Sequence, residues 1–148
     1  MTRRLDLELA AKAADALPAD RIGKDLRTVL RSLPVMIRSH GLIASGAYLL
    51  SRADGDEGNR YRVAARAILA DATASAGIRT RDGRGDALAL LDALTASGSD
   101  QRYRLAEARA RQFAIWLARL AEARFQAEEK ARQEESAPRR VDAGGDAP

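Results

Sequence analysis

The sequence contains no cysteine and only one histidine in 148 residues. The lack of cysteine excludes disulfides, thiol catalysis and cysteine-ligated zinc, and a single histidine excludes histidine-rich metal sites. Aromatic residues make up 4% of the chain, too few for recognition of RNA by rows of base-stacking rings. No apolar run approaches the ~20 residues needed to cross a bilayer, and no signal-peptide pattern opens the chain. We therefore expect a cytoplasmic protein with no membrane partner, cofactor or metal.

Hydrophobic residues make up 46% of the chain, but 32 of them are alanine. A core with so few large side chains requires helices that pack closely through their alanine faces. Apolar residues recur with a period near 3.6 along the whole chain, and no stretch alternates long enough for a strand. The pattern predicts an all-α fold, a compact helical bundle of about five to six helices with a long C-terminal helix. Residues 1–135 form this single domain, and residues 136–148, which are rich in proline and glycine, are expected to be a disordered tail.

The expected helices follow from stop signals and capping residues. Pro18 ends the first helix, Asp20 is the expected N-cap of the second, and Pro34 breaks or kinks that second helix. Gly41 is expected to be a joint. The predicted helical ranges are 5–17, a second helix from Asp20 interrupted at Pro34, 42–52, 60–73, 86–94 and 100 to about 135.

The longest predicted helix begins with Asp100 as its N-cap. Its apolar stripe follows steps of three and four residues, which indicates one face turned toward the bundle. This stripe consists of Tyr103, Ala106, Ala110, Phe113, Leu117 and Leu120. Trp116 is expected to pack within the bundle and the hydroxyl of Tyr103 to reach solvent. Beyond Phe125 large apolar residues stop, so that end is expected to project or fray.

Positive charge is concentrated in the first third of a chain whose net charge is +4. Lys24, Arg27, Arg31 and Arg38 fall within an arc of about 60° on the second helix, roughly 140° from its apolar face. We call these four residues the basic ridge. Two interpretations fit it: phosphate contacts spaced along a nucleic-acid strand, or a solvated polar face. A kink at Pro34 would move Arg38 off this arc.

Other patterns carry weaker signals. The loop 78–85 holds three arginines and fits either an RNA contact or a linker. The acidic run 54–58 lacks the glutamate that a calcium loop needs at its twelfth position. His40 could be a switch or a base, but it has no evident nucleophile or metal partner, so a structural or backbone-capping role is expected for it. No carboxylate pair or nucleophile–base pair has a defined spacing. We therefore expect no catalytic residues and no small-molecule substrate, and interpret the chain as a binding or assembly module.

Two stretches resemble a known family. Residues 32–42 and 47–51 are similar to the "Leu-Pro, Ile, Asn-Gly-Leu, Ala-Phe-Leu" segment of the small subunit of type III-B (Cmr) CRISPR effector complexes. Ser99-Asp100, Tyr103-Arg104 and residues 116–123 are similar to that family's closing helix, "Tyr-Arg … Trp-Leu-Lys-Arg-Phe-Ala-Glu-Ala". The resemblance spans residues 5–125, with His40 in place of the asparagine and Tyr48 in place of the phenylalanine.

The resemblance implies a non-catalytic helical subunit that stacks in several copies beside the effector backbone and large subunits and holds the guide RNA–target RNA duplex in antiviral defence. It assigns the basic ridge to the target-facing surface. Two alternatives stay open: a small subunit of a related type III-A or type I CRISPR complex, or a helical protein–protein adaptor without a nucleic-acid role.

Overall fold

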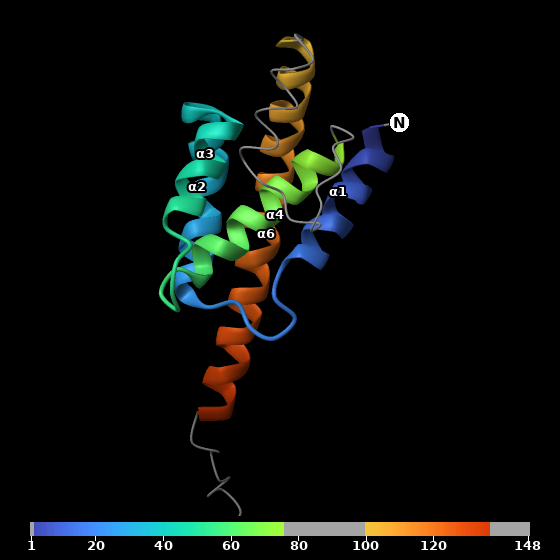
Figure 1. The fold of residues 1–148 in the computed structure, drawn as a ribbon. Helices are drawn as coiled ribbons and strands as arrows, with labels where there is room; N and C mark the ends of the chain where they lie inside the picture. The colour runs from blue at the N-terminus through green and yellow to red at the C-terminus, as the bar shows by residue number, and fades with distance from the viewer. Residues whose placement is uncertain (1, 76–99, 137–148) are drawn as a thin grey trace, which may run out of the picture.

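The computed structural model describes residues 2–75 and 100–136, all placed in helices or the turns between them (Figure 1). The described part contains no strand, and the predicted all-α class is confirmed. Its helices are α1 (Thr2–Ala16), α2 (Lys24–His40), α3 (Leu42–Ser51), α4 (Asn59–Ser75) and α6 (Asp100–Ser136). The predicted helix 86–94, the arginine loop 78–85 and most of the predicted tail lie outside the described residues.

The long helix α6 forms the axis of the bundle (Figure 1). Helix α2 packs against it more extensively than any other pair of helices in the described residues, and α1 and α4 also pack on it. The predicted stripe is confirmed, because Ala106, Ala110, Phe113 and Leu117 are buried and Tyr103 and Leu120 are partly buried. Trp116 lies at the edge of the core, partly buried against it rather than enclosed.

Helix α2 begins at Lys24, so the prediction of Asp20 as its N-cap is wrong. Gly23 occupies the cap position in an extended conformation with no capping side chain. The preceding segment is held instead by α6: Arg124 donates hydrogen bonds to the carbonyls of Pro18 (2.7 Å) and Asp20 (3.1 Å). The N–H of Ile22 donates to Glu128 (2.9 Å). These long-range bonds pair backbone groups that would be paired within the helix if α2 began earlier.

Pro34 does not break α2, which continues as one helix to His40. A proline inside a helix removes one backbone hydrogen bond and crowds the preceding turn, at a cost of about 3 kcal/mol. Before and after Pro34 along α2, the side chains of Leu30, Leu33 and Ile37 are completely buried. Their burial offsets this cost, at about 1.5–3 kcal/mol for each large side chain removed from water.

Gly41 connects α2 and α3 as predicted, with a left-handed φ of 87°. Helix α3 then packs on α4 at Gly46, where an added Cβ would lie 2.8 Å from Cδ2 of Leu69. The other face of α4 meets α6 through the buried Asp71, whose carboxylate accepts hydrogen bonds from Arg109 (3.2 and 3.4 Å). Helix α4 is thus held between α3 and α6.

The C-terminal end of α6 extends past the other helices (Figure 1), as the loss of apolar residues beyond Phe125 predicts. Residues 130–136 are all exposed. No helix in the described part of the chain is both long and apolar enough to pass through a bilayer.

Candidate nucleic-acid interface

The basic ridge lies on α2, and the structure places its four members in different environments. Because α2 is continuous through Pro34, Arg38 lies on the same helix as the other three cations. The opposite side of the helix is buried through Leu26, Val29, Leu30, Leu33 and Ile37. The predicted division of α2 into an inner apolar face and an outer basic face is therefore present.

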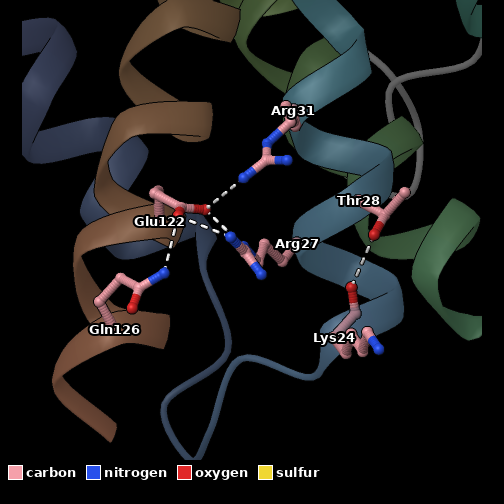
Figure 2. Close-up of polar contacts among 6 residues, drawn as sticks. All are labelled: Lys24, Arg27, Thr28, Arg31, Glu122 and Gln126. Atoms are coloured by element: carbon pink, nitrogen blue, oxygen red, sulfur yellow. Dashed lines mark hydrogen bonds and ion pairs between the residues drawn. The ribbon is translucent and has the colours of Figure 1, made fainter. Parts of the chain in front are cut away.

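Arg27 is occupied by a contact within the protein (Figure 2). Its guanidinium donates to both carboxylate oxygens of Glu122 on α6, and the Nη2–Oε1 distance is 2.8 Å. The same guanidinium lies over the ring of Phe125, 4.4 Å from the ring centroid. With 21% of its side chain exposed, Arg27 joins α2 to α6. It presents less charge to solvent than the sequence pattern predicts.

Glu122 also contacts Arg31 at 3.3 Å and accepts a hydrogen bond from Gln126 at 3.0 Å (Figure 2). The bond from Arg27, followed by that from Gln126, lowers the pKa of Glu122 from 4.5 to about 2. The carboxylate is thus ionised across the physiological pH range, and it offsets part of the positive charge of the ridge.

Arg31 remains open to solvent in spite of this contact, with 65% of its side chain exposed. Lys24 and Arg38 are also exposed. The stretch 26–53 contains no aspartate or glutamate, so acids reach this part of the surface only from elsewhere in the chain. Lys24, Arg31 and Arg38 are the exposed members of the ridge, and of these Lys24 lies outside the acid-free stretch, next to Asp25 and near Glu129 of α6.

The turn at Gly41 brings together two distant parts of the chain. An added Cβ at Gly41 would lie 3.2 Å from the hydroxyl of Tyr103 and 3.4 Å from Oε2 of Glu107. The Tyr103 hydroxyl therefore lies beside this turn, and its ring is partly buried against the core. Burial raises the pKa of Tyr103, while the backbone amides of Ile43 and Leu42 oppose that shift. His40 is exposed and lines a groove between α2 and α3.

Sequence reasoning missed the role of Glu122. Glu122 lies in the segment 116–123, and its spacing of four residues predicts a contact with Gln126. Helical spacing, however, indicates only neighbours within one helix. Its partner Arg27 is 95 positions away along the chain. Only the packing of α2 on α6 joins them.

The two stretches that carry the family resemblance thus meet in space at the approach of Tyr103 to Gly41. A model of the CRISPR-associated protein family Cas_Cmr5 matches residues 5–124. The chain belongs to the Cas_Cmr5 family. The family resemblance seen in the sequence is confirmed, and the match supports a small subunit of a type III CRISPR system. Neither the curated proteins nor the solved structures compared with the chain gave a match.

In residues 2–75 and 100–136, no three histidine or acidic side chains come together in a way that could hold a metal ion. The outer face of α2 in this Cas_Cmr5 protein offers exposed guanidinium and ammonium groups, beside a carboxylate supplied by α6.

Proposed function

We propose that this Cas_Cmr5 protein is the non-catalytic small subunit of a type III-B CRISPR effector complex in the cytoplasm. Several copies stack beside the backbone and large subunits, and the basic ridge of each copy holds target RNA paired with the guide during antiviral defence. Family membership supports the place in the complex. The outer face of α2 supports the RNA contact, because its exposed cations lie along one side of a continuous helix, and two of them, Arg31 and Arg38, lie in the acid-free stretch 26–53.

The spacing of the ridge suits a sequence-independent contact. Lys24 and Arg38 are separated by about 21 Å along the helix axis, at 1.5 Å per residue. Guanidinium groups bind phosphate oxygens, often through two hydrogen bonds at once, and contact no base edges when they do so. Each exposed contact contributes about 1 kcal/mol or less, so useful affinity requires several contacts in each copy and several copies. Base pairing to the guide then supplies selectivity.

Arg27 has a different part in this proposal. A phosphate that reaches it must displace two hydrogen bonds from Glu122 and the contact with Phe125. We therefore assign Arg27 chiefly to positioning α2 on α6, and Lys24, Arg31 and Arg38 to the direct contacts.

The test compares two triple variants in the reconstituted effector complex. Lys24→Glu, Arg31→Glu and Arg38→Glu together are expected to weaken target-RNA binding. They also reduce the slope of log affinity against log salt by about one for each phosphate that is no longer bound. Lys12→Glu, Arg66→Glu and Arg111→Glu make the same change in net charge at exposed positions on α1, α4 and α6.

The control triple variant separates a local contact from a general effect of charge. If both variants bind RNA equally well and with the same salt slope, the ridge does not contact RNA. Normal assembly together with unchanged RNA binding in both variants would favour the protein–protein adaptor instead.

A further inference from the structure

Hydrogen-bond donors from two helices converge on the carboxylate of Glu122 (Figure 2). Two come from the guanidinium of Arg27 and one from that of Arg31, both on α2, and the last comes from the side-chain amide of Gln126 on α6. Guanidinium groups bind the oxygens of carboxylates and phosphates in the same way, often through two hydrogen bonds at once. In this cluster the anion belongs to the protein itself.

The cluster of Glu122, Arg27 and Arg31 lies at the edge of the basic ridge and is open to solvent. The side chain of Glu122 is 36% exposed and that of Arg31 is 65% exposed. Arg27 is less exposed, but its guanidinium also contacts the ring of Phe125, so its position does not depend on the carboxylate alone. An external anion can therefore reach the cluster.

A second acid of α6 lies on the same side of that helix. Glu129 follows Glu122 by seven residues, about two helical turns, so the two side chains share one face. The hydrogen bond from Arg132 lowers the pKa of Glu129, and the positive charges of Arg21 and Lys24 add to this shift. Because Lys24 belongs to the basic ridge, α6 places negative charge beside the ridge at two levels.

The carboxylate of Glu122 competes with any phosphate that approaches these arginines. It is ionised at neutral pH, because the hydrogen bonds from Arg27 and then from Gln126 lower its pKa to about 2. Arg31 is 3.3 Å from Glu122, so a phosphate bound to Arg31 would lie within the Debye length of about 8 Å at physiological salt. The like charges would repel each other, and the phosphate would be held less tightly than the exposure of Arg31 indicates.

We infer that Glu122 limits the affinity of the basic ridge for RNA, by holding Arg27 and Arg31 where a phosphate would otherwise bind. Without this negative charge, Arg27 becomes a further phosphate contact and Arg31 a stronger one. A ridge that is weak in each copy binds RNA tightly only when several copies act together. The inference rests on the proposed function, and it names the residue that sets the strength of the RNA contact.

The test replaces Glu122 with glutamine, which keeps the shape of the side chain and removes its charge. In the reconstituted effector complex, Glu122→Gln is expected to bind target RNA about fivefold more tightly, the equivalent of one further exposed ionic contact. The slope of log affinity against log salt should steepen by about one for each phosphate gained. Glu134→Gln makes the same change in charge at an exposed position of α6, and it should match the wild type.

The direction of this change separates the inference from a structural role of Glu122. Loss of the Arg27–Glu122 pair can destabilise the subunit, but a destabilised subunit binds RNA less tightly. Gln126→Glu supplies the reverse test, since it adds a carboxylate beside Glu122 at an exposed position. It should weaken RNA binding about threefold relative to Gln133→Glu, an exposed change of the same charge on α6.

Equal RNA affinity of Glu122→Gln and Glu134→Gln would overturn the inference, as would equal affinity of Gln126→Glu and Gln133→Glu. If the triple variant of the basic ridge loses RNA affinity in the same experiment, the proposed function stands and only the role of Glu122 is wrong. If that triple variant also binds RNA normally, the ridge itself does not contact RNA and both proposals fail.

Discussion

At the residue scale, the Arg27–Glu122 pair shows how one ridge residue differs from its neighbours. Arg27 makes two hydrogen bonds and a ring contact inside the protein, while Arg31 shares the same carboxylate and stays exposed. The ridge thus combines one positioning arginine with cations that are open to solvent. Whether a cation on a helix face is available to a ligand therefore depends also on the acidic residues of the helix packed against it.

Glu122 should make the stability of the fold depend on pH. Its folded-state pKa of about 2 lies below the ordinary 4.5, so the pair stabilises the fold above the ordinary pKa, and this contribution is lost as the pH falls toward 2. In Glu122→Gln this titrating group is absent. Its melting temperature is therefore expected to fall less than that of the wild type between about pH 6 and pH 3.

Thermal melts followed by circular dichroism across that pH range measure the effect. Glu134→Gln, which changes an exposed residue near the end of α6, is the control and should follow the wild-type curve. Parallel curves for Glu122→Gln and the wild type would show that the pair does not stabilise the fold.

At the element scale, α3 depends on a close approach to α4. Gly46 is buried and leaves no room for a Cβ beside Leu69. Alanine is the better helix former by about 1 kcal/mol, so an exposed site would gain stability from this change. Here the packing and the helix propensity oppose each other.

We expect packing to win. Gly46→Ala should lower the free energy of unfolding by about 1–3 kcal/mol, as added methyl groups do in filled cores. Urea denaturation measures this change. In a Leu69→Val background the cost should shrink, because the atom nearest to the new Cβ is a Leu69 Cδ. A stabilised Gly46→Ala protein would show that α3 is free to move away from α4.

At the scale of the whole molecule, α6 serves two purposes along its length. Its middle part supplies the core, and the section that includes Arg124 and Glu128 fastens the segment between α1 and α2. Beyond this section, residues 130–136 are exposed. The boundary between the structural part of α6 and its projecting end therefore lies near residue 129.

Two truncations locate that boundary. A chain ending after Glu129 is expected to keep the melting temperature of the full chain, because the described residues that it lacks bury nothing. A chain ending after Ala123 also loses Arg124, Phe125 and Glu128, and should melt about 5 °C lower or more. Scanning calorimetry gives both values. Equal melting temperatures for the two truncations would contradict the fastening role of α6.

The sequence alone determined the helical class, most helix boundaries and the inner face of α2 and α6, since periodicity and capping are local properties of the chain. It also carried the family resemblance. The tertiary structure decided that α2 begins at Lys24 and passes unbroken through Pro34, and that Tyr103 faces Gly41. It also decided that Arg27 is paired with Glu122. Each of these depends on contacts between residues far apart in the chain: a helical pattern specifies which side is buried, but only packing specifies what that side meets.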